Sequence, residues 1–127
     1  DFTEYSLYFD GNQDEDAITY LTLANQLIHQ VNPNAITIAE DVSGMPGLAS
    51  PIKEKGIGFD YRMAMGIADY WVKILKTQYD EEWHVGDLFY ELTNKRKEEK
   101  TISYAESHDQ AMVGDKTLIF RLIDSLM

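Results

Sequence analysis

Apolar side chains recur at three- and four-residue intervals early in the chain, the spacing of one face of a helix. The stripe consists of Ala17, Ile18, Leu21, Ala24, Leu27, Ile28 and Val31. The acids Asp14 to Asp16 precede it, where negative charge favours the start of a helix, and Asn32-Pro33 ends it. The pattern predicts a helix over residues 14–31. We interpret His29 in its last turn as structural, because a lone histidine is not a metal site.

Three short segments predict strands: residues 35–39, 58–62 and 101–105. The first consists of small and β-branched residues, which is typical of a strand buried on both faces. Between the first two lies a loop over residues 41–58 that is rich in glycine and proline. Loops of this length in compact domains tend to be functional. Its apolar residues, Met45 and Leu48, either line a cleft or tuck the loop down, and the second is the default.

Further amphipathic patterns predict helices over residues 69–78 and 87–94, and a last helix with Asp115 as its N-cap. The expected buried side chains are Trp71, Val72 and Leu75 in the first, Leu88, Phe89 and Leu92 in the second, and Leu118, Ile119, Leu122, Ile123 and Leu126 in the third. The alternation of helices and strands predicts an α/β fold, with parallel strands joined by right-handed crossovers.

Composition limits the classes of partner. The chain has 127 residues, 44% of them apolar, a net charge of −11 and no cysteine. The charge disfavours nucleic acid and anionic membranes, which need clustered Lys and Arg, and no apolar run approaches the ~18 residues of a membrane span. The mixed charges of residues 95–100 predict a solvated connector. Because the sequence lacks an initiator Met and stops inside an apolar helical pattern, we expect it to be part of a longer chain.

Titratable groups follow two of the predicted strands. Glu40-Asp41 follows the first, and Glu106, His108 and Asp109 follow the third. The C-terminal ends of adjacent parallel strands would aim these groups into one cleft, although Glu40-Asp41 alone also fits a solvated acidic turn. A nucleophile triad of Ser107, His108 and Asp109 is excluded if these residues continue the strand, because neighbours there point to opposite faces. A metal site from Glu40, Glu106, His108 and Asp109 would lack helical ligand spacing.

Paired carboxylates are the groups that retaining glycosyl transfer requires. One carboxylate attacks the sugar carbon, while a carboxylic acid about 5 Å away protonates the leaving oxygen and later acts as base. Glu40 has the length and the strand-end position for the acid. Asp109 with His108 suits the binding of sugar hydroxyls.

Several runs of the sequence, in order and spanning nearly the whole chain, resemble the α-1,4-glucan branching enzymes of the α-amylase superfamily (glycoside hydrolase family 13). The match is closest to the eukaryotic glycogen and starch enzymes. The runs are Ala39-Glu40-Asp41-Val42-Ser43-Gly44-Met45-Pro46-Gly47, Gly58-Phe59-Asp60-Tyr61-Arg62-Met63-Ala64-Met65, Tyr104-Ala105-Glu106-Ser107-His108-Asp109-Gln110 and Val113-Gly114-Asp115-Lys116-Thr117.

The resemblance implies that residues 1–127 are the C-terminal part of a catalytic (β/α)8 TIM barrel, about strands five to seven with their helices. It implies that Glu40 is the general acid/base, that His108 contacts sugar hydroxyls and that Asp109 stabilises the transition state. On weaker grounds it places Tyr61 and Arg62 near the glucan cleft. It implies no metal and no organic cofactor.

The activity implied is transfer: an α-1,4-glucan (glycogen, starch or amylose) is cut, held as a covalent glycosyl intermediate and passed to a 6-hydroxyl as an α-1,6 branch. The family's nucleophile is an Asp in an Asp-Gly-x-Arg-x-Asp-like run on the fourth strand. This sequence has no such run, since the start at Asp10-Gly11 has Gln13 in place of the Arg. The nucleophile is therefore expected upstream.

Two other classes of function remain open. An α-amylase-like hydrolase or a debranching enzyme would share Glu40, His108 and Asp109, although Val42-Ser43-Gly44-Met45-Pro46 favours a branching enzyme by resemblance. Alternatively, the isolated chain is inactive and at most a glucan-binding piece, whose open sheet edges favour self-association. The absence of cysteine fits a cytoplasmic protein, with a plastid as the compartment of a plant-type starch enzyme.

Overall fold

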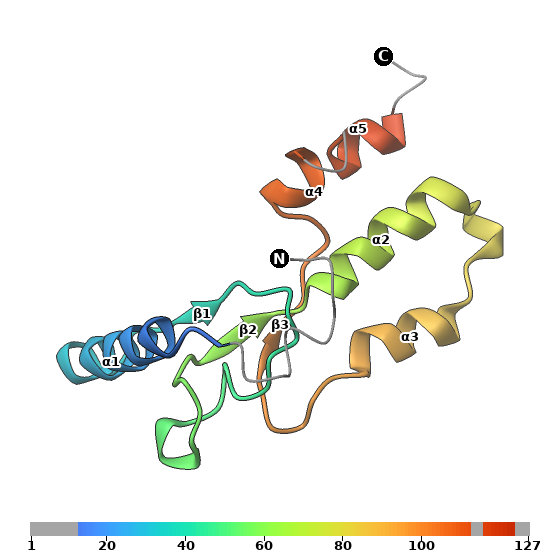
Figure 1. The fold of residues 1–127 in the computed structure, drawn as a ribbon. Coiled ribbons are helices and arrows are strands. Elements are labelled where there is room, and N and C mark those ends of the chain that lie inside the picture. Colours follow the sequence, from blue (N-terminus) through green and yellow to red (C-terminus); the bar gives the residue numbers. More distant parts are fainter. Residues whose placement is uncertain (1–12, 113–115, 124–127) are drawn as a thin grey trace. The chain divides into compact units, whose positions relative to one another are not determined.

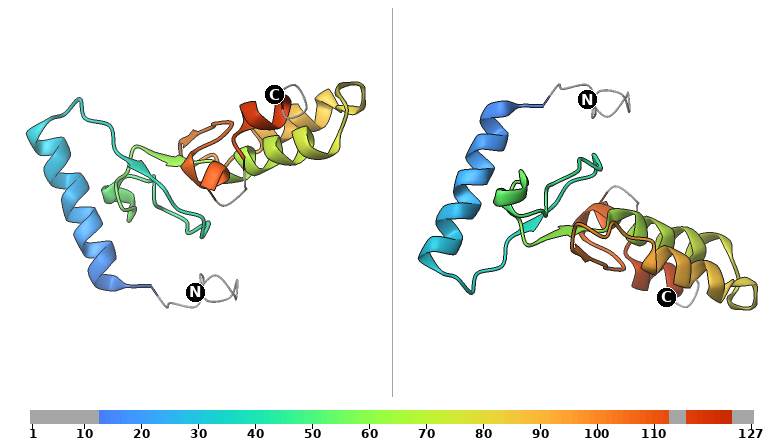
Figure 2. Two further views of the ribbon diagram at one scale, coloured as in Figure 1. Left: turned by 90° about the horizontal axis from the view of Figure 1, so that it is seen from above. Right: turned by 90° about the horizontal axis from the view of Figure 1, so that it is seen from below.

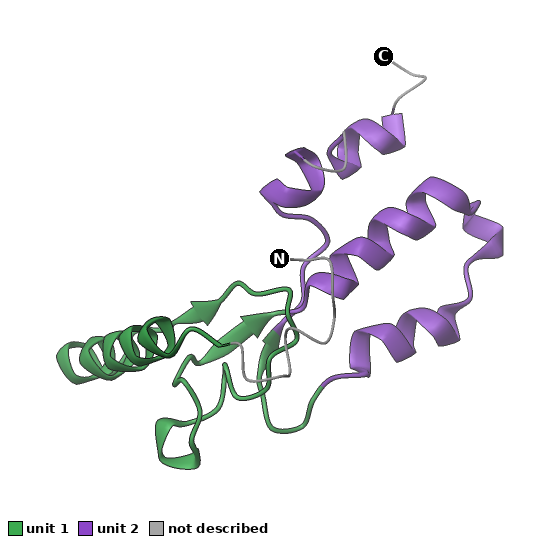
Figure 3. Cartoon of the chain, viewed as in Figure 1, with its two compact units in different colours: residues 1–63, 96–101 green, residues 64–95, 102–127 purple. Residues whose placement is uncertain are grey.

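The chain divides into two compact units (Figure 3). The computed structural model describes residues 13–112 and 116–123. The first unit comprises the chain up to Met63 together with residues 96–101, and the second comprises residues 64–95 and the chain from Ile102 onward. Within the described ranges, none of the helices combines the length and the apolar character needed to cross a membrane.

Helix α1 opens the first unit and spans Glu15–Val31 (Figure 1). The carboxylate of Asp14 caps it by accepting a hydrogen bond from the backbone N–H of Ala17, and Asn32 ends it. Both views in Figure 2 show a single uninterrupted helix. The predicted helix over residues 14–31 is therefore confirmed.

The apolar stripe of α1 is buried only in part. Ile18 and Leu21 pack against the core of the first unit, whereas Leu27 and Val31 are 60% and 77% exposed. A helix buries its apolar face only where another element covers it, and no described element covers the C-terminal half of this stripe. The fully buried side chain of α1 is instead Asn25, which donates a hydrogen bond from Nδ2 to the carbonyl of Ile57 at 3.1 Å.

Three short strands form a sheet in the order β1-β2-β3. They span Ile38–Ala39, Tyr61–Met63 and Thr101–Ile102. β1 and β2 run parallel, with Ile38 opposite Tyr61 and Ala39 opposite Arg62. The fold is thus mixed helix and parallel sheet, as predicted. The strands are shorter than expected, and Ile36 and Ile38 are exposed, so only Ala39 fits the prediction of a buried strand.

The long loop after β1 closes on itself through backbone hydrogen bonds. The N–H groups of Ile57 and Gly58 donate to the carbonyls of Gly47 and Ser50, at 2.9 and 3.0 Å. A one-turn 3-10 helix, Ile52–Glu54, lies within the loop. Leu48 joins the buried core with Ala39 and Ile57, and Met45 packs against it. These two side chains therefore tuck the loop down, as predicted by default, and they also line a cavity of the first unit, so both interpretations describe part of their role.

The second unit is helical apart from its end of β3. α2 spans Met65–Thr77 and lies beside α4 (His108–Met112) and α5 (Leu118–Ile123), and α3 spans Val85–Thr93 (Figure 1). α2 begins four residues before the predicted start at Asp69, because Ile67 and Ala68 are buried and packing outweighs the weak helix propensity of Gly66. A 3-10 turn, Asp80–Glu82, follows α2.

Several side chains predicted to be buried in these helices are exposed. They are Phe89 and Leu92 in α3, and Ile119 and Leu122 in α5. The spacing of apolar residues identified the helices correctly, but burial also requires a covering element, and none of the described segments covers these faces. The expected N-cap Asp115 and the apolar Leu126 lie outside the described residues.

Candidate active site

Glu40 stands directly after the last residue of β1, at the C-terminal end of a strand in a parallel sheet. Its side chain is exposed. The parallel pairing of Ala39 with Arg62 fixes the backbone on the N-terminal side of Glu40. Glu40 also lines a cavity of about 390 Å³ within the first unit, together with Asp41, Ser43 and apolar side chains of α1 and the loop. A parallel sheet with an acid at this end is the arrangement in which barrel enzymes place catalytic groups.

The turn after Glu40 is held by its own side chains. The hydroxyl of Ser43 donates to Oδ2 of Asp41 at 2.6 Å, and the backbone N–H of Met45 donates to that hydroxyl oxygen at 3.1 Å. Gly44 between them adopts φ +69°, a left-handed conformation that glycine takes without strain. These local bonds give the chain a defined path as it leaves the strand.

Arg62 and Glu99 connect this turn to β2 and to the segment before β3. Arg62 donates from Nη2 to Asp41 Oδ2 at 3.3 Å, and from Nη1 to the Met45 carbonyl at 2.7 Å and to Glu99 Oε2 at 3.2 Å. Arg96 donates to Glu99 Oε2 at 3.1 Å and to the Gly44 carbonyl at 2.6 Å. The side chains of Arg62 and Glu99 are only 9% and 2% exposed, so water hardly competes for these contacts.

The environment of Glu99 keeps it ionised. Burial alone would raise the pKa of Glu99, but the hydrogen bond from the Ala49 amide, the charge of Arg62 and the hydrogen bonds from Arg96 and Arg62 outweigh it and lower the pKa below its ordinary value. The prediction that residues 95–100 form a solvated connector is therefore wrong for Glu99, which is the buried member of that run. Sequence reasoning missed Glu99 because its neighbours are charged and exposed.

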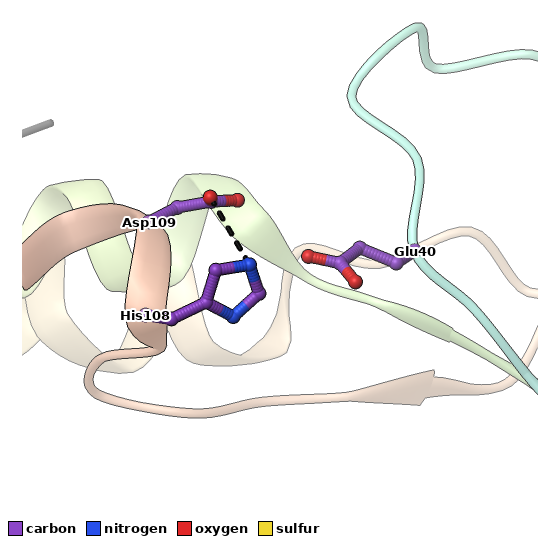
Figure 4. Close-up of side chains that lie close together, drawn as sticks. All are labelled: Glu40, His108 and Asp109. Atoms are coloured by element: carbon purple, nitrogen blue, oxygen red, sulfur yellow. Dashed lines mark ion pairs between the residues drawn. The ribbon is translucent and has the colours of Figure 1, made fainter. Parts of the chain in front are cut away.

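His108 and Asp109 form the first turn of α4, where Nε2 of His108 lies 3.3 Å from Oδ1 of Asp109 (Figure 4). The side chains are 65% and 43% exposed. The turn is fixed by Gln110, whose Oε1 accepts hydrogen bonds from the backbone N–H and the hydroxyl of Ser107. Because Glu40 belongs to the first unit and His108-Asp109 to the second, their sharing of one cleft stays a prediction.

The nucleophile triad is excluded for a different reason from the one expected. The exclusion assumed that residues 107–109 continue the strand, but His108 and Asp109 are helical. The hydroxyl of Ser107 donates to Gln110 at 2.9 Å rather than to His108, so it is not activated by the histidine. The carboxylate of Glu106 accepts the backbone N–H of Leu118 at 2.7 Å, which supports the start of α5.

The other candidate residues have mainly scaffolding contacts. The guanidinium of Arg62 is committed to Asp41, Met45 and Glu99, as described above. Tyr61 is half-buried, and Nζ of Lys100 lies 5.7 Å from the centre of its ring. His29 contacts Oδ2 of Asp60 at 2.9 Å, consistent with the structural role predicted for it.

No protein-family model matches the chain, but individual relatives match nearly all of it. The chain is 60% identical to a 1,4-alpha-glucan-branching enzyme of Felis catus over 124 residues, which are 98% of the chain. It is 57% identical to a 1,4-alpha-glucan-branching enzyme of Rhizophagus irregularis over 123 residues, which are 97% of the chain. It is 55% identical over 124 residues to the 1,4-alpha-glucan-branching enzyme 1, chloroplastic/amyloplastic, of Pisum sativum.

The chain spans only 15–18% of the length of these three relatives. Identity of this degree over nearly every residue confirms the resemblance inferred from the motifs. The chain is therefore homologous to one segment of the 1,4-alpha-glucan-branching enzymes.

Proposed function

We propose that this chain is a segment of the catalytic barrel of a 1,4-alpha-glucan branching enzyme, which cuts α-1,4 linkages of a glucan and rejoins the piece to a 6-hydroxyl. The observation that carries the proposal is 60% identity over 98% of the chain to an enzyme of that name. Parallel strands that are adjacent both in the sequence and in the sheet support the barrel, with β1, β2 and β3 as about its fifth, sixth and seventh strands.

In this proposal Glu40 is the general acid/base. The α-1,4 C–O bond breaks while the leaving 4-oxygen takes the proton of Glu40, and the sugar carbon bonds to a carboxylate supplied by another part of the enzyme. The ionised Glu40 then accepts the proton of the incoming 6-hydroxyl as that oxygen displaces the carboxylate. The exposed side chain of Glu40 at a strand end supports this role, because it can reach a bound polymer.

His108 and Asp109 are the proposed contacts to the transferred sugar. His108 would donate to a sugar hydroxyl, and the negative charge of Asp109 would stabilise the positive charge that develops on the sugar in the transition state. Their exposed side chains, paired at the start of α4, support this proposal. No step of this mechanism requires a metal or an organic cofactor.

The test is to replace Glu40 in the full-length enzyme and to measure new α-1,6 linkages on amylose by the NMR signal of their anomeric protons. Glu40→Gln should lower the rate by about 10²–10⁴-fold, the usual contribution of a general acid/base. Glu54→Gln is the matched control, because Glu54 is an exposed acid of the same unit on a 3-10 turn. A Glu40→Gln enzyme that branches at the unmodified rate would overturn the assignment.

The same assay separates branching from hydrolysis. A branching enzyme breaks one linkage for each linkage it forms, so the number of reducing ends stays constant while α-1,6 linkages accumulate. An α-amylase-like or debranching enzyme would release a reducing end at every cleavage. Reducing ends that rise in step with cleavage would refute transfer and support the hydrolase alternative.

We also propose that the 127-residue chain alone forms no branches, since it contains no Asp-Gly-x-Arg-x-Asp run that could supply the second carboxylate. β1 and β3 are the edges of the described sheet, and edges favour pairing with a second copy. Light scattering of the isolated chain tests this association. A cytoplasmic location stays a prediction for an enzyme of the animal or fungal kind, and a plastid for one of the plant kind.

A further inference from the structure

Glu99 and Arg62 form a deeply buried ion pair, with side chains 2% and 9% exposed. A buried ion pair is weak grounds for stability, because the loss of hydration of both charges offsets most of their attraction. Apolar side chains of similar volume often stabilise such a position equally well. The pair therefore calls for a role other than holding the fold together.

The contacts of the pair lead to the residue next to Glu40. Arg62 joins Glu99 to Asp41 through its two terminal nitrogens, and one of these also donates to the Met45 carbonyl at 2.7 Å. Oε1 of Glu99 accepts the backbone N–H of Ala49 at 3.0 Å. The network therefore holds the chain after Glu40 at three residues, Asp41, Met45 and Ala49.

The position of Glu40 depends on these contacts. On its N-terminal side the backbone is fixed by the pairing of Ala39 with Arg62. On its C-terminal side the fixed point is Asp41, which Ser43 and Arg62 hold. With both neighbours fixed, the backbone of Glu40 has little freedom, and its carboxyl group starts from a defined place. A displacement of about 1 Å at a reacting group can reduce a rate 100-fold.

We propose that Glu99 is a positioning residue that, through Arg62, holds the turn after Glu40 and thereby aims the carboxyl group of Glu40 at the leaving oxygen. This inference rests on the proposed function, in which Glu40 is the general acid. It gives a role to a buried residue that acts through Arg62.

The experiment compares two donors in the full-length enzyme. Amylose needs its leaving oxygen to be protonated. An α-maltooligosyl fluoride does not, because fluoride leaves as an anion without a proton. A defect in the aim of Glu40 therefore slows the first reaction far more than the formation of the glycosyl intermediate from the second. The ratio of the two rates, measured on one sample, does not depend on how much of a variant is folded.

Glu99→Gln keeps the shape of the side chain and removes the charge that binds Arg62. It should lower kcat on amylose by about 30- to 100-fold, the cost of a misplaced reacting group. KM should change less than threefold, and the fluoride rate should fall only a few-fold. Arg62→Lys should show the same signature, because one ammonium group cannot bridge Asp41 and Glu99 as the guanidinium does. Glu98→Gln is the matched control, an exposed acid beside Glu99.

Two results would overturn the inference: Glu99→Gln with the same kcat as Glu98→Gln, or equal losses with both donors, which would indicate damage to the structure alone. Glu40→Gln, run alongside, tests the proposed function separately. It should lose the amylose reaction and form the intermediate from the fluoride. If Glu40→Gln keeps the amylose reaction, the proposed function fails, and the inference about Glu99 fails with it.

Discussion

Gly56 lies where the long loop folds back on itself, and it leaves no room for a side chain. A Cβ atom added there would fall far inside contact distance of the Ser50 carbonyl group and 2.6 Å from Ser50 Cβ. Carbon atoms in contact normally stay about 3.5–4.0 Å apart. The obstructing atoms are mostly backbone and cannot rotate away, so Gly56→Ala must push the segment around Gly56 away from the segment around Ser50.

The size of the effect follows from the bonds that this displacement breaks. The N–H groups of Ile57 and Gly58, the two residues after Gly56, donate to the carbonyls of Gly47 and Ser50 at 2.9 and 3.0 Å. Each such hydrogen bond contributes about 1 kcal/mol, and overpacking adds about 1–3 kcal/mol. We expect Gly56→Ala to lower the free energy of opening this loop by roughly 3 to 5 kcal/mol.

Hydrogen exchange detected by mass spectrometry measures this locally in the full-length protein. Amides within residues 47–59 should exchange at least about 100-fold faster in Gly56→Ala, since each ~1.4 kcal/mol changes an opening constant tenfold. Gly66→Ala is the matched control, because a Cβ added to Gly66 in α2 meets nothing within 4 Å. Exchange in Gly56→Ala within threefold of the unmodified rate would refute the steric reasoning.

Two further predictions concern the first unit. Asn25→Ala removes a fully buried side chain and leaves the Ile57 carbonyl without its donor at 3.1 Å, so hydrogen exchange in the same loop should show that the free energy of opening falls by about 2–4 kcal/mol. The control Gln26→Ala, on the exposed face of α1, should change this free energy little. Equal effects of the two substitutions would contradict the prediction. Burial raises the pKa of Asp60, but hydrogen bonds from Thr37 and His29 outweigh it, so the pKa lies below its ordinary value. Ionised Asp60 therefore stabilises the folded protein. This contribution to stability is complete above the unfolded pKa of about 4 and is lost as pH falls through the lower pKa of the folded state. An Asp60→Asn protein whose melting temperature falls as steeply as that of the unmodified protein between pH 5 and pH 2 would contradict this.

The helices were predictable because their signals are local. The spacing of apolar residues and the acids at Asp14 to Asp16 identified α1 to within one residue. The strands were harder to bound, because a strand of two or three residues is defined by its partner rather than by its own sequence. Burial of the helix faces failed for a related reason, since it depends on what covers them.

The candidate site likewise combines a residue that local sequence reveals with one that only distant contacts reveal. Glu40 could be located from sequence, because an acid directly after a short apolar run indicates the end of a strand. The burial of Glu99 could not, because its contacts lie 37 positions away at Arg62 and 50 positions away at Ala49. Its own neighbours, Lys97, Glu98 and Lys100, indicate only a solvated surface.

The ion pair of Arg62 and Glu99 also has a consequence for the evolution of the chain. Its two members stand 37 positions apart, on either side of α2 and α3. The network closes before α2 begins and after α3 ends, so the turn next to Glu40 does not depend on the length of the intervening segment. Insertions and deletions there, for instance at the exposed turn Asp80–Glu82, are free to accumulate without disturbing Glu40. We expect homologues to differ in length in this segment between Arg62 and Glu99, and a reporter sequence could be inserted there.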